Sequence, residues 1–280
     1  MDNNILVQNL CKQFEGFSLD NVSFKVPKGR IVGFIGENGA GKSTTINLIL
    51  NELNKDSGQI QVFGIDHTIP TVKENIGVVF DECNFHDVFT AADIEKILKG
   101  VYKTWDSNLF SQYLKKFKIP TKKTISAFSK GMKMKLAIAV ALSHHAKLLI
   151  LDEPTSGLDP FMRDEILDIL YEFTREEDQS VLISSHIVSD LERLCDYIAY
   201  IDQGSLKLYE EKDCLIEQYG ILKCSKEELK EFDEQAVKGV RENPYGVEAL
   251  VDRSKMPKDY ETDMATLEEI IVFLSKGQEE

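Results

Sequence analysis

The stretch "GENGAGKS", residues 36–43, decides the fold of this 280-residue chain, because it fits the phosphate-loop pattern G-x-x-x-x-G-K-[ST]. The apolar segment "RIVGFI" (30–35) precedes it, and "KSTTINLILNEL" (42–53) follows it with apolar residues at helical spacing. In a strand, loop and helix of this kind, glycines let successive backbone N–H groups face a phosphate at the positive end of the helix. The alternative, a glycine-rich turn that binds nothing, does not explain both flanks.

Two side chains of the loop add specific chemistry. Lys42 supplies a mobile positive charge, and Ser43 offers a hydroxyl to Mg²⁺. We therefore expect a nucleotide to be bound by the loop residues Gly36, Glu37, Asn38, Gly39, Ala40, Gly41, Lys42, Ser43 and Thr44.

Strands alternate with helical patterns from the loop to about residue 212. The apolar segments "KLLILDE" (147–153), "SVLISS" (180–185) and "YIAYID" (197–202) are separated by such patterns. This alternation predicts an α/β fold with a mostly parallel sheet core, as in P-loop NTPases. Short alternating segments before residue 36 predict an antiparallel β subdomain.

Two further regions complete the predicted organisation. Residues 90–119 carry helical periodicity and end before Pro120, which predicts an inserted α-helical subdomain at about 84–145. Beyond about residue 212 the chain becomes polar and turn-rich, with one more helical pattern at 266–277. We expect one nucleotide-binding domain over 1–214 and a small C-terminal α+β extension of unknown role over 215–280.

The segment "KLLILDEP" (147–154) narrows the classes of nucleotide-binding protein that the loop alone leaves open. Its apolar strand ends in Asp152 and Glu153, at the carboxyl edge of the sheet beside the phosphate loop. Asp152 is suited to holding the water shell of Mg²⁺, and Glu153 to accepting a proton from a water that attacks the γ-phosphate. The alternative is a surface turn with two solvated acids.

Composition excludes several other functions. The formal net charge is −14, which argues against nucleic acid as the main partner. The five cysteines form no CxxC pair, so neither a zinc site nor a disulfide framework is indicated. Apolar runs such as "LAIAVAL" (136–142) are far shorter than the roughly 20 residues needed to cross a bilayer. We expect a cytoplasmic protein, with any membrane crossing left to a partner.

Taken together, the motifs resemble those of the ATP-binding subunits of ABC transporters, over roughly residues 3–210. The segment "LDEPTSGLDP" (151–160) is similar to that family's Walker B strand running into its D-loop, and "ISSH" (183–186) to its switch strand. The resemblance implies that residues 1–214 form an ATPase domain with ATP and Mg²⁺ as cofactors.

The segment "FSKGM" (128–132) stands where the family has its L-S-G-G-Q signature. The resemblance implies that Ser129, Lys130 and Gly131 bind an ATP held by another subunit, because two such domains meet head to tail. Physically, Ser129 can cap a helix whose free N–H groups face the γ-phosphate, while Lys130 adds positive charge. Lys133 and Lys135 are expected to lie in solvent.

The resemblance also implies roles for three further individual residues. Phe14 stands where an aromatic ring stacks on adenine, although an ordinary core position in a strand is the alternative. His186 is placed to reach the γ-phosphate and Glu153. Asp159 resembles the D-loop aspartate that contacts the opposite subunit.

The chain departs from the family at two positions. Asp81 replaces the glutamine that senses Mg²⁺ and the attacking water, and Lys130 replaces a signature glycine. Aspartate can still bind magnesium. Because these positions would meet from opposite subunits around one γ-phosphate, we expect them to form a compensating charge pair in the dimer. The alternative is that each substitution is tolerated separately.

The resemblance implies an ATP-binding and hydrolysing subunit that powers a transporter, with the motif spelling closest to bacterial ABC-2-type exporters. The expected partners are a second ATPase subunit, identical or related, and an integral membrane permease that holds the chain at the inner face of the membrane. Phe85, Val88 and Phe89 are candidates to line the groove for that permease. The alternatives are a soluble ABC-type ATPase, or a regulatory subunit that binds ATP without energising transport.

Overall fold

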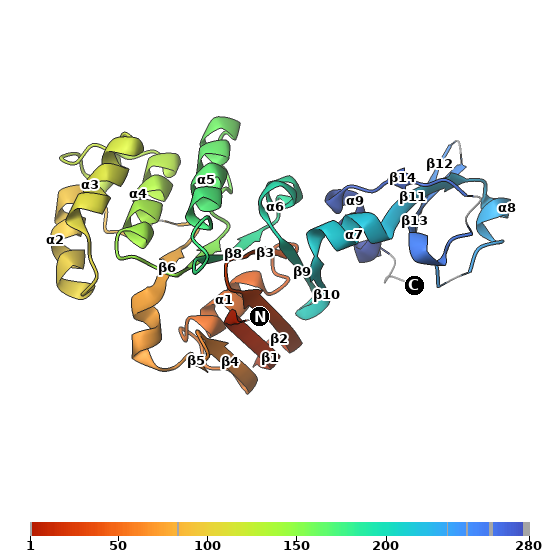
Figure 1. Ribbon diagram of the computed structural model, residues 1–280, viewed down its shortest axis with the longest axis horizontal. Coiled ribbons are helices and arrows are strands. Elements are labelled where there is room, and N and C mark those ends of the chain that lie inside the picture. The colour runs from red at the N-terminus through yellow and green to blue at the C-terminus, as the bar shows by residue number, and fades with distance from the viewer. Residues whose placement is uncertain (1, 83, 234, 245, 258–259, 277–280) are drawn as a thin grey trace.

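The computed structural model describes residues 2–276 except 83, 234, 245, 258 and 259. Two β-sheets organise these residues (Figure 1). The larger sheet has ten strands in the order β5-β4-β1-β2-β10-β9-β3-β8-β7-β6. The strands are β1 (Asn3–Phe14), β2 (Phe17–Pro27), β3 (Ile31–Ile35), β4 (Ser57–Val62), β5 (Ile65–Asp66), β6 (Ile76–Val79), β7 (Leu148–Asp152), β8 (Ser180–Ser185), β9 (Tyr197–Asp202) and β10 (Ser205–Glu211).

The central strands of this sheet run parallel. Strand β3 pairs with β8 and β9, β8 pairs with β7, and β7 pairs with β6, all in parallel. The predicted α/β class with a mostly parallel core is confirmed. Strands β1, β2, β4 and β5 pair antiparallel, and they form the β subdomain expected at the N-terminal end. The carboxyl ends of β3, β6, β7 and β8 therefore meet at one edge of the sheet.

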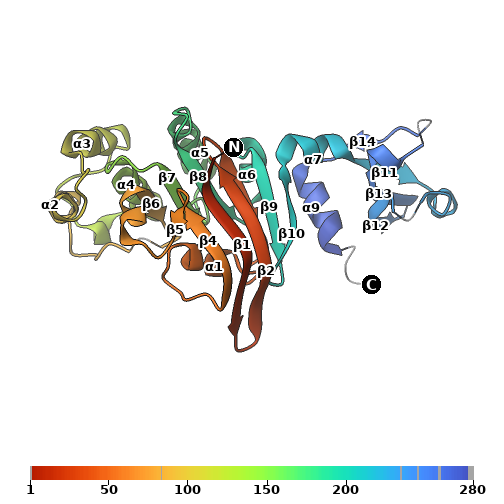
Figure 2. The same ribbon diagram turned by 60° about the horizontal axis from the view of Figure 1, so that its bottom comes forward.

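Alternate residues of the parallel strands face two different cores, as expected for strands that are buried on both faces. In β7, Leu149 and Leu151 pack with the helices of one face, whereas Leu148 and Ile150 pack with the core that contains the other helix. The helices of the first face are α4 (Lys130–Leu142), α5 (Pro160–Phe173) and α6 (Val188–Leu194), and α1 (Lys42–Ile49) lies on the second face, between the parallel strands and the β subdomain (Figures 1 and 2).

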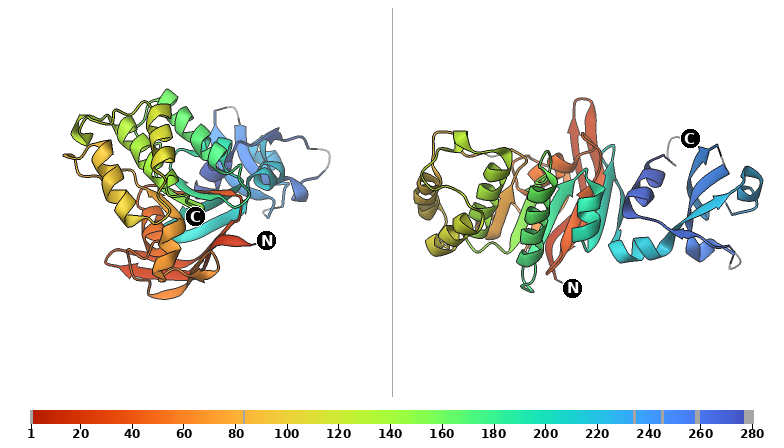
Figure 3. Two further views of the ribbon diagram at one scale, coloured as in Figure 1. Left: turned by 60° about the vertical axis from the view of Figure 1, so that its left-hand side comes forward. Right: turned by 90° about the horizontal axis from the view of Figure 1, so that it is seen from above.

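The helical subdomain lies at one end of the molecule (Figure 3) and contains α2 (Ala91–Val101), α3 (Ser107–Lys116) and α4. The periodicity over 90–119 is divided between two helices. The Asp106 side chain accepts hydrogen bonds from the backbone N–H groups of Asn108 and Leu109, which caps α3. Because this carboxylate satisfies the free N–H groups of a helix start, a new helix begins at residue 107.

The second sheet lies at the opposite end of the molecule (Figure 3) and is antiparallel, in the order β12-β13-β11-β14. Helix α9 packs against β12 and β13 and also contacts α6 of the larger unit. The close approach needs glycine in β12, since a Cβ on Gly239 would lie 2.5 Å from the backbone oxygen of Phe273. The elements of this region are α7 (Lys212–Gln218), β11 (Tyr219–Cys224), α8 (Lys226–Leu229), β12 (Val237–Asn243), β13 (Gly246–Asp252), β14 (Asp263–Met264) and α9 (Leu267–Lys276).

The boundary predicted between residues 214 and 215 falls inside α7, and the division into two domains remains a prediction. Short 3₁₀ helices occur at Pro70–Asn75, Ile125–Ala127 and Arg253–Lys255. None of the helices in the described part of the chain is both long and apolar enough to cross a bilayer.

Candidate nucleotide-binding site

The phosphate loop follows β3 and leads directly into α1. Gly39 and Gly41 have φ values of 85° and 113°, a left-handed conformation that side chains rarely adopt. At Gly41 space is also limiting, because a Cβ there would lie 2.6 Å from Cδ2 of Leu19. The glycines predicted from the motif are thus required by backbone conformation and by packing.

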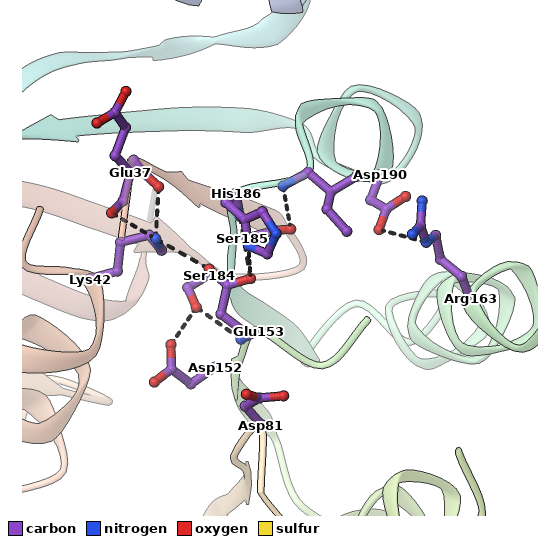
Figure 4. Close-up of polar contacts among 12 residues, drawn as sticks. Glu37, Lys42, Asp81, Asp152, Glu153, Arg163, Ser184, Ser185, His186 and Asp190 are labelled. Atoms are coloured by element: carbon purple, nitrogen blue, oxygen red, sulfur yellow. Dashed lines mark hydrogen bonds and ion pairs between the residues drawn. The ribbon is translucent and has the colours of Figure 1, made fainter. Parts of the chain in front are cut away.

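The Lys42 side chain lies across the loop and is only 5% exposed. Its Nζ donates to the backbone oxygens of Gly36 at 2.7 Å and Glu37 at 3.1 Å. The same ammonium lies 3.2 Å from Oε1 of Glu153 (Figure 4). The structure therefore brings the predicted loop lysine and the predicted base together, although 111 positions of sequence separate them.

The Asp152 carboxylate and the Glu153 backbone at the end of β7 are held by Ser184, a residue that no sequence motif indicated. Ser184 Oγ donates to Asp152 Oδ1 at 2.5 Å and accepts from the backbone N–H of Glu153 at 3.0 Å. Parallel pairing places Asp152 opposite Ser184, which explains the contact. The signal was present in the sequence, because Ser184 lies near the end of the strand that precedes His186, and the ends of neighbouring parallel strands meet at one edge.

His186 lies beside the same carboxylate. Its Nδ1 is 2.7 Å from Glu153 Oε2, and its backbone N–H donates to that oxygen at 3.3 Å (Figure 4). Glu153 itself has a φ of 51°, which turns its side chain out of the strand direction. The Glu153 carboxylate therefore lies between the Lys42 ammonium and the His186 ring at the mouth of the phosphate loop.

The residues predicted to hold Mg²⁺ form a donor set of the right kind. Asp152 is buried and its Oδ1 is fixed by Ser184, while the Ser43 side chain is exposed at the start of α1. Within the described residues no group of three His, Cys, Asp or Glu side chains gathers to hold a metal ion. A hydroxyl with one or two carboxylates nevertheless fits Mg²⁺, which takes oxygen ligands and completes its shell with water and substrate phosphates.

Asp81 follows β6 and emerges at the same edge of the sheet, beside Asp152 (Figure 4). Its carboxylate is engaged, however, because Lys130 Nζ lies 2.7 Å from Asp81 Oδ1. We expected this charge pair to form between opposite subunits. The structure forms it inside one chain, because α4 packs against β6 and brings the start of the signature helix to the end of that strand.

The signature residues begin α4 as predicted. Ser129 is the N-cap residue, and its Oγ accepts from the backbone N–H of Met132 at 3.2 Å. Gly131 is buried under the first turn of α5, since a Cβ there would lie 2.4 Å from Cε of Met162. In the described part of the chain, no hydrogen bond or ion pair joins Ser129, Lys130 or Gly131 to the phosphate loop.

Two lysines expected in solvent are paired instead. Lys135 is buried and its Nζ lies 2.6 Å from Glu165 Oε2 on α5. Lys133 Nζ lies 2.9 Å from Asp87 Oδ1. The prediction of a solvated lysine was wrong for Lys135, because α5 covers its face of α4, whereas Lys133 keeps 29% of its side chain exposed in a surface ion pair.

The D-loop leads directly into α5, which in turn contacts α6. Asp159 caps α5, because its side chain accepts from the backbone N–H groups of Phe161 and Met162, each at 3.1 Å. Further along α5, Arg163 Nε lies 3.7 Å from Oδ2 of Asp190, a buried residue on α6 (Figure 4). The helix after the D-loop and the helix after His186 are thus linked by a partly buried ion pair.

Phe14 lies at the end of β1 and is 36% exposed, which does not match a core position. Its ring stacks near that of Phe17, with centroids 6.3 Å apart. Phe17 in turn adjoins the phosphate loop, because its Cζ would lie 3.1 Å from a Cβ on Gly41. Lys12 Nζ also lies over the Phe14 ring, 5.6 Å from its centroid. The structure therefore places the ring predicted to stack on adenine next to Phe17 near the phosphate loop, partly exposed and contacted by Lys12.

Comparison with known proteins gives one consistent family. The family model described as "ABC transporter" matches residues 19–156. The chain is 33% identical over 217 residues to "ABC transporter ATP-binding protein YtrB" of Bacillus subtilis (strain 168), a match that covers 77% of this chain and 74% of YtrB. It is 39% identical over 197 residues to "Bacitracin transport ATP-binding protein BcrA" of Bacillus licheniformis, covering 68% of this chain and 63% of BcrA.

Solved structures agree. A protein described as an ATP-binding subunit of an ABC transporter superposes with a TM-score of 0.69 at 27% identity, over 76% of this chain and 92% of that one. The dimeric ATP-binding cassette MJ0796, bound to ADP and Pi, superposes with a TM-score of 0.66 at 23% identity, over 74% of this chain and 98% of the cassette. The second likeness concerns the fold alone.

Proposed function

Because the chain belongs to the family of ABC transporter ATP-binding proteins, we propose that it hydrolyses ATP to power export through a separate membrane-spanning permease. The observation that carries this proposal is the cluster of Lys42, Glu153 and His186 at the mouth of the phosphate loop. Beside the cluster, Ser184 fixes the Asp152 carboxylate and accepts from the backbone N–H of Glu153. Export as the direction rests on relatives such as BcrA, which is named for bacitracin transport.

The residues of the cluster have distinct tasks. Lys42 can transfer from the loop carbonyls to the β- and γ-phosphates, and Glu153 is then free to take a proton from the attacking water. His186 holds Glu153 from the other side and faces the γ-phosphate. Mg²⁺, when bound, neutralises developing charge on the phosphates, and Ser43, Asp152 and Asp81 are the residues that would hold it or its waters.

Hydrolysis needs a second subunit in this proposal. The phosphate loop starts α1 on one face of the sheet, whereas Ser129 starts α4 on the other, so one chain supplies two separate half-sites (Figures 1 and 2). A head-to-tail dimer would close each ATP between one chain's loop and its partner's signature. Asp159, at the start of α5, would then lie at the contact between the two subunits.

The permease would dock beside the helical subdomain. A cavity of about 530 Å³ lies there, lined in part by Leu50, Leu53, Val78, Phe80 and Tyr102. The groove residues proposed from sequence differ from this set: Phe85 and Phe89 pack against the core, and Val88 is 65% exposed. This cavity is therefore a better docking position for a short apolar helix of a membrane partner than the surface formed by Phe85, Val88 and Phe89.

The direct test replaces the proposed base. Glu153→Gln should lower steady-state phosphate release by about 10²- to 10⁴-fold while ATP binding persists. Glu82→Gln, at an exposed glutamate on the loop after β6, is the matched control and should retain turnover. Undiminished hydrolysis in the Glu153 variant would refute the assignment of the base.

A second candidate function is favoured by one observation. Since Asp81 is already paired with Lys130, the chain could be a regulatory subunit that binds ATP without turning it over. Phosphate release by the purified protein, alone and with its permease, distinguishes the two: turnover in either preparation supports the first proposal, and its absence in both supports the second.

A further inference from the structure

The ion pair between Asp81 and Lys130 joins the loop after β6 to the start of α4, and the D-loop lies beside it. Asp81 follows β6, Lys130 is the first residue of α4, and the two charged atoms are 2.7 Å apart. Lys130 also touches the D-loop, because a Cβ on Gly157 would lie 3.5 Å from its Nζ. Gly157 has a φ of 67°, a backbone conformation in which a side chain would be strained.

The two partners of the bridge serve different ATP molecules. Asp81 emerges beside Asp152 at the edge where the chain's own phosphate loop lies (Figure 4). Lys130 is the first residue of α4, next to the capping Ser129, and in the proposed dimer this helix end would face the second subunit's ATP. A bridge within one chain therefore connects the two ATP sites of a dimer.

We propose that this bridge is an exchange device that couples the two ATP sites, an inference that rests on the proposed dimeric ATPase. In the free chain Asp81 holds the Lys130 ammonium. With Mg²⁺–ATP in the chain's own site, Asp81 would be one of the residues that hold the metal or its waters, and Lys130 would then be free to reach the γ-phosphate of the ATP bound by the second subunit. Occupation of one site thereby strengthens binding at the other.

The exposure of the two side chains determines whether they can separate and how strongly the two ATP sites are coupled. The Asp81 and Lys130 side chains are 43% and 45% exposed and border a cavity of about 400 Å³, so they can part without unpacking the core. A half-exposed ion pair is worth little, which limits the coupling to about two- to fivefold in an equilibrium constant.

A second bridge between the same two segments provides an internal control. Lys133 Nζ lies 2.9 Å from Asp87 Oδ1, also between α4 and the loop after β6. Lys133 is one turn away from the helix end that would face the phosphate. Breaking this pair should loosen the same contact between segments without releasing a cation to ATP.

The test measures ATP-driven dimerisation of the full chain by light scattering, in a Glu153→Gln background and in EDTA so that no metal competes for Asp81. Asp81→Asn should lower the ATP concentration at half-maximal dimer formation about two- to fivefold, because Lys130 is then free. The same substitution combined with Lys130→Gln should give no such gain. Asp87→Asn, with and without Lys133→Gln, should leave the midpoint unchanged.

The outcomes separate the exchange device from the proposed function. An Asp81→Asn gain that depends on Lys130 supports the device. An equal effect of Asp81→Asn with and without Lys130, or an equal Lys133-dependent gain in the control pair, overturns it while the ATPase proposal stands. Failure of every variant to dimerise at any ATP concentration would overturn the proposed dimer and the device together.

Discussion

Ser184 offers the sharpest test of how the site is held together, because no motif identified it. Its hydroxyl donates to the Asp152 carboxylate at 2.5 Å and accepts from the Glu153 N–H at 3.0 Å, and the side chain is fully buried. Ser184→Ala removes both contacts. The Glu153 N–H keeps a partner, since it also donates to the Ser184 backbone oxygen at 3.2 Å, so the main loss is the bond to the carboxylate.

A hydrogen bond to a charged group contributes about 1.5–3 kcal/mol, and we expect Ser184→Ala to lower the free energy of unfolding by that amount. Because Asp152 is then free to rotate away from the metal position, the Mg²⁺ concentration for half-maximal ATPase activity should rise about 10- to 100-fold. Urea denaturation and Mg²⁺ titrations of phosphate release measure the two effects.

Two further substitutions make this prediction specific. Ser184→Thr keeps the hydroxyl and should restore most of the Mg²⁺ affinity. Ser185→Ala is the matched control: Ser185 is a buried neighbour on β8, and its Oγ accepts from the backbone N–H of Ile187 at 2.9 Å, with no bond to Asp152 or Glu153 among the described residues. If Ser184→Ala and Ser185→Ala shift the Mg²⁺ requirement equally, the positioning role of Ser184 is refuted.

The remaining predictions concern adenine stacking on Phe14, the ion pair between α5 and α6, and the pH dependence of stability. Phe14→Ala should weaken ATP binding about 5- to 100-fold, the value of one lost stacking contact, with little change in the maximal rate; a fluorescent-nucleotide titration that shows unchanged affinity would contradict the stacking role. Arg163→Met strands the buried Asp190 carboxylate and should cost up to about 3 kcal/mol of stability in urea denaturation, whereas the double variant Arg163→Met/Asp190→Leu should recover part of it. Burial lowers the pKa of His144 below its ordinary 6.5, so the unfolded chain takes up the extra proton first as pH falls. The free energy of unfolding should therefore be highest above about pH 6.5 and should fall below that pH by at most about 1.4 kcal/mol per pH unit. His144→Gln should flatten that slope between pH 7.5 and 5.5, leaving the contribution of His67, whose pKa is also lowered by burial. An unaltered slope would show that His144 is not its source.

Much of the site was predictable from sequence because its functional residues lie close together in short segments. The glycines and lysine of residues 36–43 act through local backbone conformation, and Ser129 caps the helix that starts directly after it. Asp152 and Glu153 could be placed beside the loop because an apolar strand runs into them, and the carboxyl ends of parallel strands share one edge. The fold class was also predictable, because strands that alternate with helices in the sequence form a mostly parallel sheet.

The C-terminal region was harder to predict, since its strands carry little alternation of apolar and polar residues. Strands β12 and β13 form a hairpin around a turn-rich segment, and α9 closes over them only where Gly239 leaves room. The sequence by itself indicated an α+β extension, but neither its antiparallel sheet nor its contact with α6.

Tertiary structure decided which charged groups meet. Sequence showed that Asp81 and Lys130 carry complementary charges, and a family comparison assigned them to opposite subunits. The packing of α4 against β6 instead joins them within one chain, and the packing of α5 on α4 buries Lys135 beside Glu165. Motif residues act through the backbone on which they stand, whereas ion pairs between distant segments depend on how helices pack onto strands, which no local pattern encodes.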